Sequence, residues 1–295
     1  MSQSIALAQN FLGVLDTVYK RESLTTRLDA APGEVDFVGA DTCKVYKLTM
    51  DGLGNYSRAN GYPTGEVNGS WETFQLTKDR GVNLGVDRFD NEESKNMAFG
   101  RLAGEFMRTQ VVPELDAYRF AKMSAAQTLV KADITVGTTD CVDLIDAAEQ
   151  QMQEDEVPEE GRILYVSPKM YAGIKAKVTR YLANENGVNR EIEIFNKMPV
   201  IVVPQSRFNT AVTLNDGSSS FGFAPTAGGY KINFQIVHPS AVKNVVKAAI
   251  PKVFSPDENQ TADKWLFQYR LYHDCFLWDN KKKGIYTHTA STANS

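Results

Sequence analysis

The feature that most constrains this chain is a long segment that reads as a single β-hairpin. Within TCKVYKLTM, residues 42–50, the apolar side chains of Tyr46, Leu48 and Met50 share one face of a strand. The alternation returns downstream, where one face carries Phe74, Leu76, Val82, Leu84 and Val86. Between the arms, ANGYPTGEVNG at residues 59–69 is rich in Gly, Pro and Asn, which favour chain reversal. The pattern therefore predicts a two-stranded ribbon with one apolar face.

The length of this ribbon raises the question of what covers it. Arms of about fifteen residues, at about 3.3 Å per residue, would extend roughly 50 Å. A compact domain of this chain's length has a radius of gyration near ~19 Å, so the ribbon would cross the molecule or leave it. Because an isolated two-stranded ribbon is marginally stable in water, its apolar face needs cover. Either other strands of the chain or another subunit must supply that cover.

Composition excludes several classes of protein. The chain has 295 residues, 42% of them hydrophobic, which is ample for one large or two smaller folded domains. A net charge of −4 gives no basic field for binding nucleic acid through its phosphates. The widely spaced Cys43, Cys141 and Cys275 contain no CxxC pair and favour free thiols in a reducing compartment. With no leader and no long apolar run, we expect a cytoplasmic protein without a membrane segment.

The rest of the chain alternates helix and strand signals. Residues 3–24 predict a short amphipathic helix followed by an extended arm. A long helix is expected from about residue 89, with a kink or break at Pro113 and a second helical stretch from Glu114 to about Val130. An α/β layer follows, and aromatic strands close the chain. The predicted fold class is therefore α+β.

The residues that carry chemistry do not assemble into a catalytic or metal site. His238, His273 and His288 lack metal-ligand spacing, and no phosphate-binding glycine loop is present. Carboxylates at helical spacing, typical of a solvated helix face, occur at Asp140, Asp143, Asp146 and Glu149. The Asp79–Arg80 and Asp87–Arg88 dipeptides are expected to form ion pairs that pin the hairpin to the helix. We predict no catalytic residue, no cofactor and no metal.

The order of elements and several local strings resemble the major capsid proteins of tailed bacteriophages. GNYSRANGYPTGEVNGSWETFQLTKDRGVNLGVDRFDNEES is similar to the extended loop of that family and its exit into the spine helix, the long helix of the fold. VVPELDAYRFAKM is similar to a spine-helix segment of capsid proteins from phages of Gram-positive bacteria. VIVVPQSRF, INFQIVHPSAV and YHDCFLWDNKKKGIY resemble the end of the axial domain and the closing part of the peripheral domain. The resemblance runs from about Ala30 to Tyr286.

This resemblance implies a domain organisation and a role. It implies an N-terminal arm, an extended β-hairpin loop, a spine helix within the peripheral domain, an axial domain and a C-terminal part of the peripheral domain, at residues 1–35, 36–88, 89–131, 132–235 and 236–295. The hairpin would lie across an adjacent subunit and the arm would clasp another neighbour. The predicted inter-subunit contact residues are Phe11, Tyr46, Leu48, Tyr56, Tyr62, Trp71, Phe74 and Leu76. Replacing Phe74 and Leu76 by Ser is expected to spare the fold and abolish shells.

The implied function is a structural one without catalysis. Copies of the chain would form the hexamers and pentamers of an icosahedral phage head that encloses double-stranded DNA without reading its sequence. Expected partners are a separate scaffolding protein, because only a short arm precedes the hairpin, together with a portal and a decoration protein. The expected location is the virion capsid, and the host cytoplasm during assembly. No spacing of Lys47, Lys78 and Asn280 identifies an isopeptide pair, so no cross-link is predicted.

Two other functions stay open at this point. One is an encapsulin-type nanocompartment shell, which would need an inner groove for a cargo peptide. The other is an oligomeric cytosolic α/β enzyme with its site at subunit interfaces.

Overall fold

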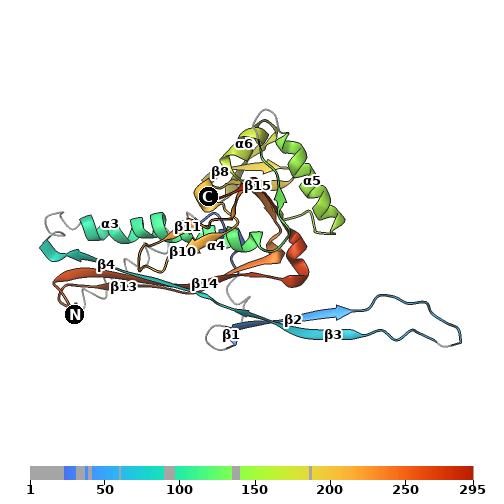
Figure 1. The fold of residues 1–295 in the computed structure, drawn as a ribbon, viewed down its shortest axis with the longest axis horizontal. Helices are drawn as coiled ribbons and strands as arrows, with labels where there is room; N and C mark the ends of the chain where they lie inside the picture. Colours follow the sequence, from blue (N-terminus) through green and yellow to red (C-terminus); the bar gives the residue numbers. More distant parts are fainter. Residues whose placement is uncertain are drawn as a thin grey trace.

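The computed structural model describes residues 23–30, 37–38, 42–59, 61–89, 97–134, 140–185 and 188–294. Two sheets lie one above the other with a long helical segment between them, and a slender hairpin extends sideways from the lower sheet (Figure 1). The predicted helix over residues 3–24 lies outside the described residues.

The lower sheet has three antiparallel strands in the order β13–β14–β4, which span Val242–Phe254, Lys264–Leu277 and Lys78–Asp87. Its upper face is apolar because alternate residues of β4 and β14 point toward the helix. Phe267, Tyr269 and Leu271 of β14 pack there against Met107 and Leu115. One face of this sheet thus forms a core with the long helix.

The long helix consists of α3 (Met97–Phe106), a π-helical turn (Met107–Val111) and α4 (Val112–Ser124). Pro113 lies in the first turn of α4, where its missing amide hydrogen is tolerated, and the wider π turn comes immediately before it. The expected break at Pro113 is therefore a local widening of a continuous helix. The expected helical stretch to Val130 is wrong: α4 ends at Ser124, because Val130 pairs with the upper sheet in β5.

The upper sheet has seven strands in the order β5–β15–β12–β6–β9–β8–β7. In that order the strands span Val130–Lys131, Ile285–Ala293, Tyr230–Val237, Ile163–Val166, Met198–Val202, Val188–Phe195 and Thr179–Glu185. Helices α5 (Cys141–Glu154) and α6 (Pro168–Ile174) cover its outer face (Figure 1). Asp140 and Ser167 cap these two helices by accepting hydrogen bonds from Val142 N and Met170 N.

The remaining elements are short. A two-stranded sheet joins β10 (Val212–Leu214) to β11 (Phe223–Pro225). Short 3-10 helices span Thr26–Leu28, Lys175–Lys177, Gln205–Arg207, Pro239–Ala241 and Asp279–Gly284.

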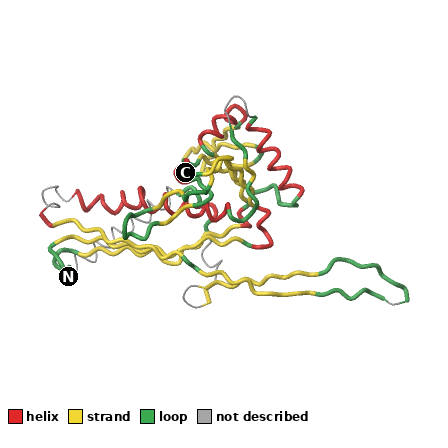
Figure 2. The backbone as a smooth tube through the Cα atoms, viewed as in Figure 1, coloured by secondary structure: helices red, strands yellow, loops and turns green. Residues whose placement is uncertain are grey.

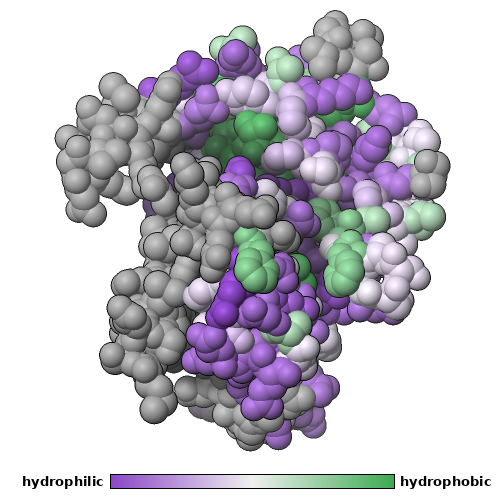
Figure 3. All heavy atoms as spheres, turned by 90° about the vertical axis from the view of Figure 1, so that its left-hand side faces the viewer, coloured by the Kyte–Doolittle hydropathy of each residue, from purple (hydrophilic) through white to green (hydrophobic). Residues whose placement is uncertain are grey.

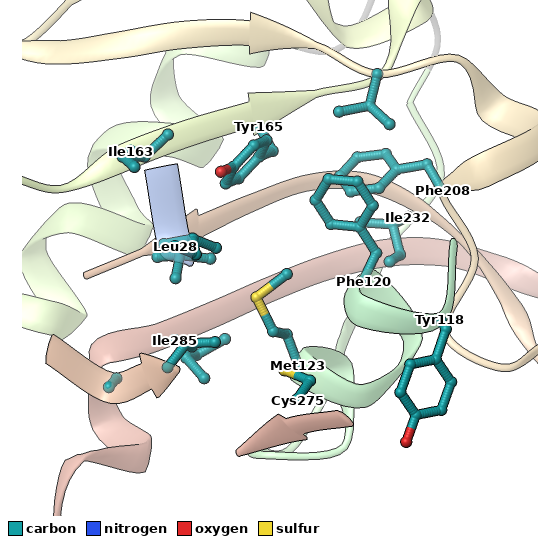
Figure 4. Packing of buried hydrophobic residues seen from close by; sticks show 14 residues of the cluster. Leu28, Tyr118, Phe120, Met123, Ile163, Tyr165, Phe208, Ile232, Cys275 and Ile285 are labelled. Carbon is teal, nitrogen blue, oxygen red and sulfur yellow. The ribbon is translucent and has the colours of Figure 1, made fainter. Parts of the chain in front are cut away.

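Strand β6 shows how the upper sheet separates two cores. Leu164 and Val166 face α5 and α6, whereas Ile163 and Tyr165 face α4 on the other side. Figure 4 shows the second core, in which Phe120 and Met123 of α4 meet Tyr165, Ile232 and Ile285. A helix with apolar contacts to both the upper and the lower sheet ties them together.

The hairpin differs from the prediction in two respects. The strand register puts Phe74 opposite Cys43, on the face opposite to Tyr46, so the expected single apolar face is wrong. Strands β2 (Thr42–Met50) and β3 (Val67–Gln75) pair antiparallel, with the short β1 (Phe37–Val38) beside β2. The expected second arm, however, divides after Gln75, and β4 leaves the hairpin to pair with β14. Only β2 and β3, nine residues each, form the free hairpin.

A buried polar network fixes the segment 23–30 to α4. Asp116, fully buried, accepts hydrogen bonds from Ser23 Oγ, Leu24 N and Thr25 Oγ1, at 2.9, 3.1 and 2.8 Å, and pairs with Arg207. Arg119, also buried, donates to Thr25 Oγ1 and pairs with Asp29 at 3.0 Å.

Within the described ranges no helix is both long and apolar enough to cross a membrane.

Candidate assembly surface on the β2–β3 hairpin

One face of the hairpin is an apolar strip exposed to solvent. In the antiparallel register, Tyr46 lies opposite Trp71, and Met50 lies opposite Val67. The rings of Tyr46 and Trp71 meet edge to face with centroids 5.1 Å apart, yet 54% and 64% of the two residues stay exposed. Leu48, between these pairs, is also exposed. We call Tyr46, Leu48, Met50, Val67 and Trp71 the hairpin strip.

Gly69 shapes this strip. It lies opposite Leu48 in the strand register, and the ring of Tyr46 lies over it. A Cβ atom at this position would collide with the phenol of Tyr46. The glycine therefore lets the ring lie across the surface of the strand pair.

The loop beyond the strands continues the apolar character. Tyr56 and Tyr62 meet edge to face with ring centroids 5.0 Å apart, next to a bridge between Ser57 and Gly61. Both tyrosines and Leu53 are exposed. Figure 2 shows this loop extending well past the body of the molecule.

The root of the hairpin, in contrast, is packed into its own chain. Leu76 is only 3% exposed and lies in a small core with Cys43, Val245 and Phe276. Phe74 stacks on Phe276 with centroids 5.0 Å apart. Its own chain already buries Leu76, so little of this side chain is left for the predicted contact with a neighbouring subunit.

Hydrogen bonds at the root reinforce this packing. Tyr118 of α4 donates its hydroxyl to Asp274 Oδ1 at 2.6 Å, and burial raises the pKa of this phenol. Tyr272 donates its hydroxyl to the carbonyl of Leu76 at 3.1 Å. At the base of β3, burial and the nearby Asp279 raise the pKa of Glu72. The hairpin is thus held firmly at one end and free at the other.

The predicted contact residues fall into three groups. Tyr46, Leu48, Tyr56, Tyr62 and Trp71 are exposed on the hairpin. Phe74 and Leu76 belong to the root, and Phe11 lies outside the described residues. Met50, Leu53 and Val67 are also exposed on the hairpin but were not among the predicted contact residues. Strand alternation already placed Met50 on the apolar face, whereas Leu53 lies in a loop that gives no periodic signal.

Other candidate chemical groups have structural partners. His273 and His288 are buried, and burial lowers their pKa values to about 3 and about 4. Asn196 Nδ2 donates to Asp146 and Glu149, so two of the helix-face carboxylates hold a turn. Among the described residues, no cluster of three or more His, Cys, Asp or Glu could hold a metal ion. Arg80 pairs with Glu114 of α4 at 2.7 Å, as an ion pair between β4 and the helix.

The end of the molecule opposite the hairpin looks different. Figure 3 shows that hydrophilic side chains cover most of the described surface there, with apolar atoms in small separate patches. Such scattered patches are ordinary on soluble proteins, whereas a continuous apolar strip marks an interaction surface.

Comparisons with known proteins identify the fold. No family model matches the sequence, and no curated protein is similar to it in sequence. A solved structure of Gordonia phage Cozz has a TM-score of 0.63 at 10% identity, covering 92% of this chain and 87% of that chain. The mature capsid of bacteriophage PhiM1 gives a TM-score of 0.60 at 11% identity, covering 85% and 82%.

A third match is a virus-like particle from Pyrococcus furiosus, with a TM-score of 0.54 at 13% identity that covers 96% of this chain and 99% of that chain. Because identity is low throughout, these matches establish the fold alone. The predicted α+β class and the resemblance in fold to tailed-phage capsid proteins are confirmed. The chain has the phage capsid fold.

Proposed function

We propose that this chain is the structural major capsid protein of a tailed phage and builds a closed shell from copies of itself. The observation that carries the proposal is the exposed hairpin strip on a phage capsid fold. A strip of this kind is unfavourable in an isolated subunit and favourable once a neighbour covers it.

The energetics favour assembly. Burying a large apolar side chain fully contributes about 1.5–3 kcal/mol, so the hairpin strip of one subunit could contribute on the order of 10 kcal/mol. Association costs about 4–15 kcal/mol in lost translational and rotational freedom, which is similar in size to the gain from one hairpin contact. Each subunit in a closed ring both gives and receives a hairpin, so the ring has one such contact per subunit, and the contact that closes the ring carries no further association cost. Hexamers and pentamers are the rings that close an icosahedral head.

The proposed role does not involve catalysis. Within the described part of the chain, the buried His288 forms a hydrogen bond with Asn233, and the carboxylate of Asp146 accepts one from Asn196. Neither residue belongs to a group of described residues that contains a nucleophile and a base. The acidic net charge of −4 suits a container that encloses double-stranded DNA without gripping it. The proposed partners are a separate scaffolding protein, a portal and a decoration protein, and assembly takes place in the host cytoplasm.

A second candidate function is an encapsulin-type compartment shell. It is favoured by the likeness to the virus-like particle from Pyrococcus furiosus, which covers nearly the full length of both chains. Such a shell would use the same hairpin contacts but enclose a protein cargo in place of DNA.

Negative-stain electron microscopy of the purified chain tests the proposal. Closed shells or capsomer rings are expected for the native sequence, and a double variant with Tyr46→Ser and Trp71→Ser should remain a folded small species. The matched control is Phe89→Ser, since Phe89 is an exposed aromatic residue away from the hairpin. Normal shells from the double variant, or uniformly small particles from the native chain with lysate from phage-bearing cells, would contradict the proposal.

A further inference from the structure

A cavity of about 310 Å³ lies between the long helix and the lower sheet. Its floor is formed by Val82 and Leu84 of β4 and by Tyr269 and Leu271 of β14, and its roof by the helix on both sides of the π turn. The roof residues are Phe106, Gln110, Val111, Glu114 and Leu115. The walls are therefore largely apolar.

The loop between β10 and β11 closes one side of this cavity. Phe221 and Gly222 of that loop line the cavity, and Phe221 itself is 74% exposed. Arg80 holds the loop in place by donating from Nη1 to the carbonyl of Asn215 at 2.6 Å. Phe221 thus lies at the mouth of the cavity, with one side toward the cavity and the other toward solvent.

The charges at the mouth neutralise each other. Arg80 donates from Nε and Nη2 to the two carboxylate oxygens of Glu114, at 2.7 and 3.2 Å. An anion in the cavity would lie near Glu114 and a cation near Arg80, so a charged ligand gains little in return for its lost hydration. Gln110 places an uncharged amide at the same mouth, close to Gly222.

We propose that this cavity is a binding site for a neutral, flat, apolar molecule of about two fused rings that carries one hydroxyl or carbonyl group. Size supports this class, because an apolar cavity of about 150 Å³ holds benzene and this one is about twice as large. The rings would lie between Leu84, Phe106 and Tyr269. The hydroxyl or carbonyl group of the ligand would form a hydrogen bond with the side-chain amide of Gln110 at the mouth of the cavity.

Such a ligand would join three parts of the molecule. The cavity is bounded by the long helix, the lower sheet and the β10–β11 loop, so a bound molecule adds contacts to all three at once. A ligand that binds only the folded state raises stability in proportion to the logarithm of its concentration. Occupancy is therefore expected to stiffen the junction between the lower sheet and the rest of the subunit.

Isothermal titration calorimetry of the full chain with 2-naphthol tests the site. We expect saturable binding with one molecule per chain and a rise in the unfolding temperature. The charged analogue 2-naphthalenesulfonate is expected to bind at least about tenfold more weakly because it must lose its hydration in the cavity.

Variants locate the binding. Val82→Phe fills the floor of the cavity and is expected to weaken 2-naphthol at least about tenfold, while the matched change Val246→Phe, on β13 and outside the cavity lining, leaves binding unchanged. Phe221→Ala removes an exposed side chain at the mouth without disturbing the core and should weaken binding severalfold. Unchanged affinity in Phe221→Ala and in folded Val82→Phe, equal affinity for the sulfonate, or non-saturable uptake would each overturn the proposal.

Discussion

Thr77 donates both its backbone amide and its hydroxyl to Oδ2 of Asp274, at 2.9 and 2.8 Å. These two residues are 197 positions apart in the chain. The contact lies where the chain leaves the hairpin and enters the lower sheet, so it fixes the direction in which the hairpin projects.

Removing the hydroxyl of Thr77 should loosen this attachment. Thr77→Val keeps the shape of the side chain but leaves one oxygen lone pair of Asp274 without its donor. Because hydrogen bonds to charged groups contribute about 1.5–3 kcal/mol, the free energy of unfolding should fall by that amount. Chemical denaturation measures this loss, and Thr73→Val, at an exposed site on β3, should change stability by less than about 0.5 kcal/mol. Equal effects of the two changes would contradict the role of the contact.

The hairpin root and the hairpin strip should respond differently to the same substitution. Leu76→Ser removes a buried side chain and places a hydroxyl in the root core, so we expect a loss of about 2–5 kcal/mol in the free energy of unfolding. Leu48→Ser changes an exposed residue and should leave the isolated subunit's stability nearly unchanged while reducing shell yield. Denaturation combined with electron microscopy separates the two effects. A Leu76→Ser subunit of native stability would show that the root is not a core.

Buried His288 should make stability depend on pH. Its folded-state pKa lies near 4, below the ordinary value of about 6.5, because burial disfavours the charged ring. The unfolded chain therefore binds the proton first as pH falls, and stability should decline from about pH 6.5 down to about pH 4. His288→Phe should reduce the slope of unfolding free energy against pH in this window. A slope identical to that of the native chain would show that His288 titrates alike in both states.

The acceptor at the centre of the buried network should be critical for folding. Asp116→Ala removes the buried acceptor of several donors at once, including the buried Thr25, and leaves the half-buried Arg207 without its carboxylate. We expect a loss of about 3–5 kcal/mol, the range for breaking a buried ion pair. The exposed Asp143→Ala on α5 should cost no more than about 1 kcal/mol. Comparable losses in the two variants would argue against the network.

Local patterns predicted the elements, and distant contacts decided how they pair. The apolar residues from Phe74 to Val86 share one parity, interrupted by Lys78 and Arg80 at the start of β4. This interruption does not show which strand β4 pairs with. Asp274, which accepts hydrogen bonds from Thr77 at the break after Gln75, lies in another strand. In the same way, Pro113 predicted a disturbance in the helix but not that a π turn would absorb it. The fold class was predicted from the order of helices and strands along the chain. Errors in where one element ends or which strand it pairs with do not change that order.

The candidate surface was predicted in part for a related reason. Alternation placed Tyr46, Leu48 and Met50 on one apolar face, and all three are exposed. Trp71 belongs to that face only through the strand register, which the sequence pattern did not show. The same pattern assigned Leu76 to a neighbouring subunit, because an apolar side chain carries no mark of which chain will bury it. Only the three-dimensional position of Phe276 and Val245 shows that Leu76 is already covered.

Gly69 has a consequence for any surface that meets the hairpin. With no side chain at this position, the ring of Tyr46 lies down across the strand instead of standing up from it. The strip is therefore a shallow shelf with no ridge along its middle, and a partner that fits it must itself be nearly flat there. Flat contacts tolerate small changes in tilt, so one chain could meet its neighbours at the slightly different angles that rings of five and of six require.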